Sequence, residues 1–219
     1  MTNSFLQFFF FCRETLVFLR RFLLSLNTYI SIGISLDEDL IPKVKTFLSN
    51  KNEFFIELTR EALEKLFSEE IIFNCKQFIQ KKHVNTNTFQ LDPTTTISPI
   101  QIYDKLGFAI KNNEKNIQIS FLATTYERLI LHDQLLESHQ RELQDTLSAA
   151  KIAIFKCKSL FEENFYTCES DENIVNNILQ SFKNSHTNPL EIELIILCHK
   201  KFIHKIHEDK RKELANTDV

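Results

Sequence analysis

The stretch that decides the expected fold is residues 117–166, IQISFLATTYERLILHDQLLESHQRELQDTLSAAKIAIFKCKSLFEENFY, which contains neither glycine nor proline. Apolar residues recur along it at alternating spacings of four and three, and only two positions of this seam are polar. Such heptad spacing is typical of a coiled coil or of an interior helix of an antiparallel bundle. We therefore predict one long helix over about 117–166. The seam consists of Leu122, Tyr126, Leu129, Asp133, Leu136, Gln140, Leu143, Leu147, Ala150, Ile154, Cys157 and Phe161.

The central part of this seam is the candidate partner-binding site. If the helix projects from the protein, its apolar side chains would contact a second chain, and the two polar residues would set the register of that contact. If the helix is interior, the same side chains would form the core. Both interpretations stay open at this point. The candidate partner-binding residues are Leu129, Asp133, Leu136, Gln140, Leu143 and Leu147.

The low glycine content restricts the fold. The 219 residues include two glycines, Gly33 and Gly107, and four prolines. Dinucleotide-binding turns, P-loops and nucleophile elbows need closely spaced glycines, so these site classes are excluded in their usual forms. A β-sandwich or barrel needs many tight turns. We therefore predict an all-α fold, an elongated helical bundle of six to eight helices with the heptad-patterned helix as its spine.

Composition shifts along the chain predict its organisation. Threonine and asparagine replace the apolar periodicity in one stretch, which is typical of a linker. Before this stretch, a Phe-rich segment and a helical hairpin are expected, and after it a bundle that contains the long helix. The predicted order is an N-terminal helical segment (1–36), a helical hairpin region (37–83), a linker (84–98), a helical bundle (99–213) and a frayed tail (214–219).

The N-terminal segment has three interpretations. Arg13, Arg20 and Arg21 interrupt its apolar residues, so that no uninterrupted run reaches the length of a membrane span. Three interpretations therefore remain. The segment is a buried core helix, or a helix that docks on a membrane surface or on a partner protein, or a mitochondrial targeting sequence.

Charge and cysteine content bear on partners and compartment. The formal net charge of −3 gives no overall attraction for nucleic acid, which is therefore not expected as a partner. The five cysteines are odd in number and form no C-x-x-C pair, which predicts reduced thiols that serve as small core residues in an intracellular, cytoplasmic protein. The alternatives are the membrane periphery and the mitochondrion.

Only one group of residues has spacing suited to a metal. His204, His207 and Glu208 would share one face of the final helix, although Arg211 stands where a His-Glu-x-x-His motif needs its second histidine. Because this helix end is rich in lysine, we expect a solvated surface, with no metal, no cofactor and no catalytic residue. Additional ligands would have to come from the long helix, where the candidates are His132, Glu137 and His139.

These patterns favour a non-catalytic helical protein–protein interaction module: an adaptor, an assembly subunit or an effector-type binding protein. Its expected partner is another protein, or a second copy bound through the long helix. The first alternative is a peripheral membrane-associated helical protein that uses residues 5–34. A metal-dependent enzyme is the second alternative.

Overall fold

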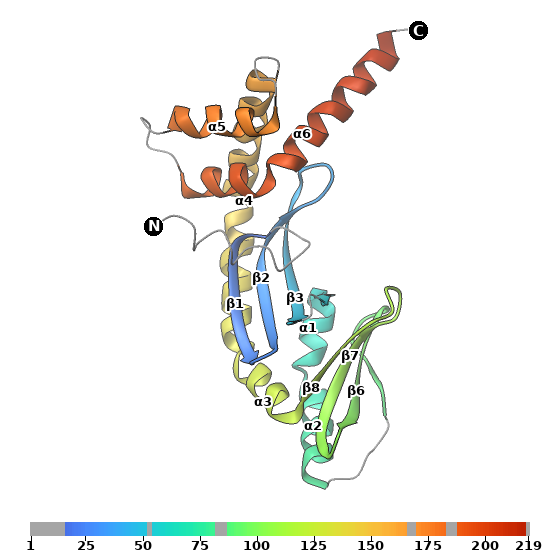
Figure 1. Cartoon of the computed structure of the whole chain (residues 1–219). Coiled ribbons are helices and arrows are strands. Elements are labelled where there is room, and N and C mark those ends of the chain that lie inside the picture. The colour runs from blue at the N-terminus through green and yellow to red at the C-terminus, as the bar shows by residue number, and fades with distance from the viewer. Residues whose placement is uncertain (1–15, 52–53, 82–86, 166–169, 183–187, 218–219) are drawn as a thin grey trace. The chain divides into compact units, whose positions relative to one another are not determined.

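The structure, a computed structural model, describes residues 16–51, 54–81, 87–165, 170–182 and 188–217 (Figure 1). It has a mixed α/β fold with two four-stranded sheets and six helices in the described part of the chain. The expectation of an all-α helical bundle is therefore wrong. The reason is that three stretches with expected helices, residues 1–36, 37–50 and 99–122, contain strands in their described parts.

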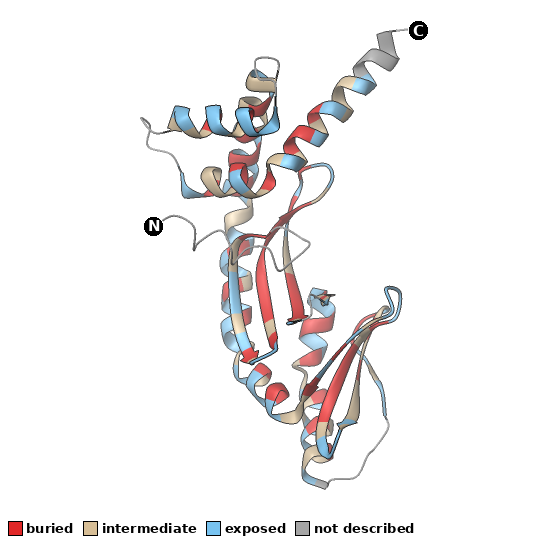
Figure 2. Ribbon diagram, viewed as in Figure 1, coloured by how far each residue is buried: buried red, intermediate tan, exposed pale blue. Residues whose placement is uncertain are grey.

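The first sheet has the strand order β1 (Val17–Ser25), β2 (Thr28–Leu36), β3 (Pro42–Asn50) and β4 (Phe55–Leu58). Strand β2 explains why this part of the chain is extended. Every second residue from Thr28 to Leu36 is buried, and three of these are β-branched isoleucines, which suit a pleated surface. The intervening Ser31, Gly33 and Ser35 are buried as well, and Figure 2 shows β2 in red along most of its length. A Phe-rich helix over residues 17–36 is thereby ruled out.

The second sheet has the order β5 (Phe89–Gln90), β6 (Thr95–Ile102), β7 (Lys105–Asn112) and β8 (Ile117–Leu122), with antiparallel neighbours. Pro99, the first residue of the predicted helical bundle, lies within β6 opposite Phe108. Ile119 and Phe121 alternate with exposed Gln118 and Ser120, as in a strand with one buried face. The start of the predicted helical bundle (99–213) and the first six residues of the expected long helix therefore contain strands.

The chain makes its tight turns largely without glycine. Three residues other than glycine adopt left-handed backbone conformations in the turns that precede β3, β7 and β8, namely Leu40 (φ 61°), Tyr103 (φ 52°) and Asn116 (φ 50°). Side chains support two of these turns: Asp37 Oδ1 accepts the amides of Asp39 and Ile41, and Asn112 Oδ1 accepts that of Lys115. A low glycine count therefore does not exclude a sheet-rich fold here.

The helices are α1 (Arg60–Leu66), α2 (Glu69–Lys81), α3 (Ala123–Leu131), α4 (Asp133–Phe165), α5 (Asp171–Ser181) and α6 (Pro189–Thr217). Side-chain caps fix several starts: Thr59 accepts the amide of Ala62 at α1, and Ser170 accepts that of Asn173 at α5. The expected long helix is thus divided into β8, α3 and α4, and α4 remains the longest helix.

The described residues form two compact units. Unit 1 contains residues 20–32 and 45–141, and unit 2 contains residues 16–19, 33–44 and 142–217. In unit 1, the second sheet packs with α1, α2 and α3 around a core in which Phe108 of β7 contacts Phe78 of α2 and Tyr126 of α3. In unit 2, Phe161 of α4 stacks on Phe202 of α6, with ring centroids 5.2 Å apart. None of the helices in the described ranges is both long and apolar enough to cross a membrane.

Candidate functional site

The predicted partner-binding seam lies mainly inside the folded chain. Leu129 and Leu136 belong to the core of unit 1, and Leu143 is buried in unit 2. The remaining members, Asp133, Gln140 and Leu147, are half-buried. Leu129, Leu136 and Leu143 therefore hold α3 and α4 against their own chain.

The candidate metal ligands on α6 do not converge. His204 and His207 are exposed, and the His207 ring lies edge-on to Phe165 at a centroid distance of 4.8 Å. Glu208 lies 3.8 Å from the ammonium of Lys205. In the described ranges, no three histidine, cysteine, aspartate or glutamate side chains are grouped to hold a metal ion, and this includes His132 between α3 and α4 and Glu137 and His139 of α4.

The lysines of α6 make intramolecular contacts instead. Lys205 Nζ lies 2.7 Å from Asp39 Oδ1, in the turn between β2 and β3, and Lys201 donates to the carbonyl oxygen of Leu36. Lys158 of α4 pairs with Asp209 of α6 at 2.8 Å. The hydrogen bond to Asp39 raises the pKa of Lys205, because it stabilises the charged ammonium. These charges therefore fasten α6 within unit 2.

The described thiols are poor nucleophiles. Cys75, Cys157 and Cys198 are free and buried, as expected for core residues. Burial raises the pKa of Cys75 to about 11 and those of Cys157 and Cys198 to about 12. Because the thiolate is the reactive form, all three remain protonated and unreactive near neutral pH.

One carboxylate, Asp92, is buried in unit 1 but is fully engaged. It accepts the amides of Thr94 and Thr95 at 2.8 and 2.7 Å, and the hydroxyl of Thr59 at 2.7 Å. Burial acts to raise the pKa of Asp92, but these hydrogen bonds outweigh it and hold the pKa below its ordinary value. Since Thr59 also caps α1, this carboxylate joins the β5–β6 turn to the start of that helix.

The outward face of α4 carries the best candidate for a binding surface. Ile152 and Phe155 are 62% and 73% exposed, although both are large apolar residues. At 100° per residue, they lie with Ser148 and Ser159 on the face opposite the buried Ala150, Ala153, Ile154, Cys157 and Phe161. We call the residues Ser148, Ile152, Phe155 and Ser159 the outer stripe.

The outer stripe could have been found in the sequence. A single interior seam explains the residues at heptad spacing but leaves Ile152 and Phe155 on the opposite side of the helix. A helix that is apolar on two opposite faces has a second contact to make.

Comparisons of the chain with family models, curated proteins and solved structures give no match.

Proposed function

We propose that the protein is a non-catalytic assembly subunit that associates with a second copy of itself through the outer stripe of α4. The observation that carries this proposal is the exposure of Ile152 and Phe155 at the centre of one helix face, three residues apart. Neighbours at this spacing form one continuous contact area. Burial of large side chains against a matching helix removes this apolar area from water.

The pattern of the outer stripe suits a contact between identical surfaces. Its two large residues are central, and a serine follows at a distance of four residues on each side. The order is thus small, large, large, small in both directions, so each copy can offer large side chains to the other. A two-fold contact uses the same patch on both partners, and small residues at its ends allow two helices to approach closely.

The inertness of the buried groups supports a non-catalytic role. Protonated thiols do not act as nucleophiles, and the carboxylate of Asp92 already accepts local donors. An adaptor or effector-type protein with a different partner would use the same stripe, but it would not self-associate through it.

The proposal predicts that the double variant Ile152→Ser and Phe155→Ser weakens self-association. Burial of a large apolar side chain contributes about 1.5–3 kcal/mol, so loss of two from each copy should raise the dimer Kd at least about 100-fold. Sedimentation equilibrium of the wild type and of the double variant measures this change. Both residues are exposed, and thermal unfolding should show that the variant remains folded.

Leu26→Ser provides the matched control, because it removes an exposed apolar residue from unit 1. It should leave the dimer Kd unchanged. A wild type that stays monomeric at all accessible concentrations would contradict the proposal, as would a double variant that dimerises like the wild type.

A further inference from the structure

Two neighbouring turns at one end of the first sheet carry exposed apolar side chains. Leu26, in the β1–β2 turn, is 93% exposed, and Leu23, near the end of β1, is 64% exposed. Phe54, which precedes β4, is 53% exposed. The two turns lie together because the amide of Lys51 donates to the carbonyl oxygen of Asn27 at 2.9 Å. We call Leu23, Leu26 and Phe54 the hairpin-end surface; all three belong to unit 1.

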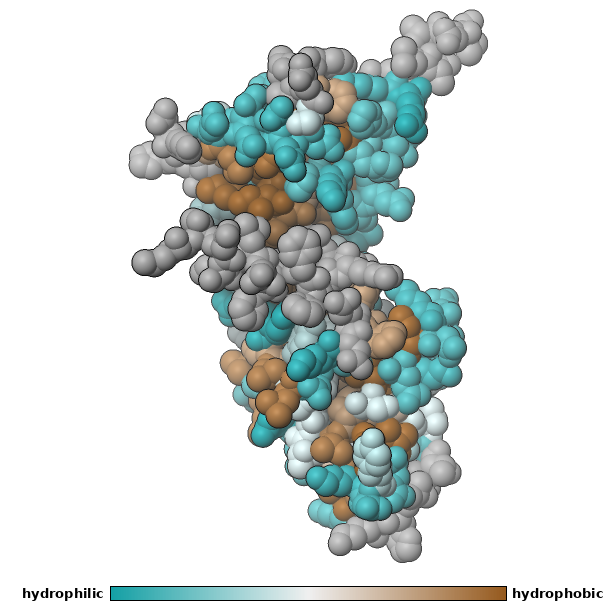
Figure 3. Space-filling view, viewed as in Figure 1, coloured by the Kyte–Doolittle hydropathy of each residue, from teal (hydrophilic) through white to brown (hydrophobic). Residues whose placement is uncertain are grey.

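This surface has no packing partner among its immediate neighbours in the hairpin. Leu24 points to the opposite side of the sheet from Leu23 and is buried in the core of unit 1. Figure 3 shows brown, hydrophobic surface where the lower ends of β1 and β2 lie in Figure 1. Apolar side chains of this size at the tips of turns expose area to water without any gain in stability for the fold.

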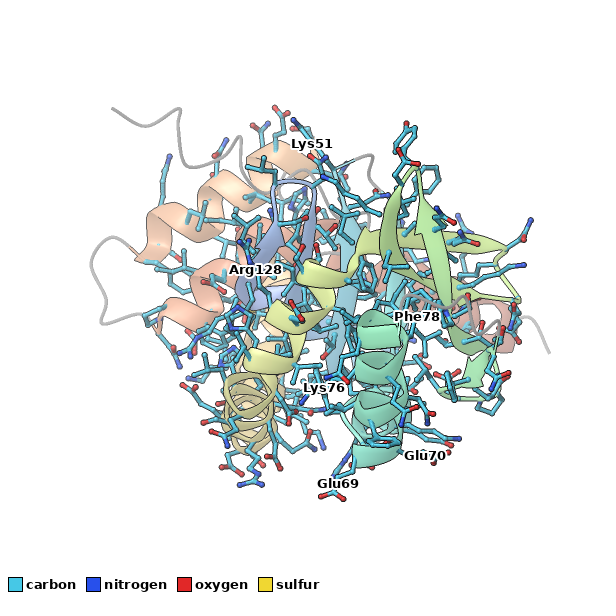
Figure 4. All side chains as sticks on the ribbon, turned by 90° about the horizontal axis from the view of Figure 1, so that it is seen from below. Lys51, Glu69, Glu70, Lys76, Phe78 and Arg128 are labelled. Carbon is cyan, nitrogen blue, oxygen red and sulfur yellow. The ribbon has the colours of Figure 1, made fainter. Side chains whose placement is uncertain are left out.

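Cationic side chains surround the hairpin-end surface. Arg21 lies over the ring of Tyr29 at 4.4 Å, Lys51 is exposed, and Arg128 of α3 donates to the carbonyl oxygen of Leu24 at 3.2 Å. Figure 4 views this end from below and shows the labelled Lys51 and Arg128 beside the β1–β2 hairpin.

Acidic residues are fewer around this end. The hairpin from Val17 to Leu36 contains two arginines and no acidic residue. Among the described residues close by in the sequence, Glu57 of β4 pairs with Lys45 at 3.3 Å, and Glu127 precedes Arg128 on α3. The local charge is therefore positive although the whole chain has a net charge of −3.

We propose that unit 1 docks on an anionic lipid surface through the hairpin-end surface. Leucine and phenylalanine at turn tips can enter the boundary between headgroups and acyl chains, while the surrounding arginine and lysine residues contact the anionic headgroups. A protein partner would need a hollow shaped to receive projecting turns, whereas a bilayer deforms around them. This proposal uses another unit and other residues than the self-association of α4.

Vesicle flotation of the full chain tests the proposal. The protein should float with phosphatidylcholine vesicles that contain phosphatidylserine and remain unbound with phosphatidylcholine alone. Leu26→Ser should weaken binding roughly tenfold or more, because it removes the most exposed apolar side chain from the contact. The pair Arg21→Gln and Lys51→Gln should weaken it by about fivefold for each charge, and added salt should weaken wild-type binding in the same direction.

Two controls distinguish this contact from non-specific hydrophobic adsorption to vesicles. Tyr103→Asn removes an equally exposed aromatic residue from the β6–β7 turn, where asparagine tolerates the left-handed backbone, and it should not change flotation. Phe155→Ser should also have no effect, since it alters only the outer stripe. The proposal is overturned if the wild type does not bind anionic vesicles, or if Leu26→Ser binds them as the wild type does.

Discussion

Replacement of Phe108 by alanine is expected to lower the free energy of unfolding by about 3–5 kcal/mol, the usual range for a buried phenylalanine. Phe108 is completely buried, and its ring lies 5.5 Å from that of Phe78 and 4.7 Å from that of Tyr126. The substitution therefore removes the side chain that joins β7 to both α2 and α3. Urea unfolding followed by circular dichroism measures the change.

Phe73→Ala is the matched control for this prediction. Phe73 lies on α2 like Phe78, but it is exposed, so its removal should change the free energy of unfolding by no more than about 0.5 kcal/mol. Equal effects of the two substitutions on the free energy of unfolding would contradict the placement of Phe108 in the core of unit 1.

The helices of the second half of the chain could largely be predicted from local signals. Ser170 caps α5, and Pro189 opens α6 with Glu191 in its first turn. The heptad seam also identified buried residues of α3 and α4, including Leu129 and Leu143. These features succeed because caps and apolar periodicity act within a few residues of one another.

The sheets were missed for two physical reasons. First, the low glycine content indicated few tight turns, but Leu40, Tyr103 and Asn116 adopt the left-handed conformations that glycine usually supplies. In addition, β2 is buried on both faces, so its small Ser31 and Ser35 do not mark a solvent side. The alternation in β8 is clear, but Leu122, its last residue, is also the first residue of the heptad pattern, so the predicted helix extended over the strand.

For a physical reason, the sequence alone could not assign the seam to an internal or an external contact. A seam in the sequence indicates that apolar residues need a contact, but not whether the contact is internal. The structure assigns Leu129, Leu136 and Leu143 to internal contacts. What decides this is long-range packing, such as the hydrogen bond from Tyr126 to the carbonyl oxygen of Leu66, 60 residues away. Single-sequence periodicity contains no information on such pairs.

Asp92→Ala is expected to lower the free energy of unfolding at neutral pH by about 2–5 kcal/mol, since it leaves buried donors without their charged acceptor. The amides of Thr94 and Thr95 would lose their acceptor, and the hydroxyl of Thr59 would lose its link to the β5–β6 turn. Asp92→Asn keeps one oxygen as acceptor and should therefore cost less. Chemical unfolding of both variants measures these differences.

The stabilising effect of Asp92 should depend on pH in a definite direction. The pKa of Asp92 in the folded protein is lowered, so its carboxylate binds protons less readily there than in the unfolded chain, where the pKa is about 3.9. Its contribution is then complete above about pH 5 and is lost as the pH falls through the folded-state pKa. The difference in unfolding free energy between wild type and Asp92→Asn should thus shrink in acid. A difference that stays constant would mean that hydrogen bonding at Asp92 does not favour its ionised form. Asp104→Asn, at the exposed β6–β7 turn, controls for the general loss of one negative charge.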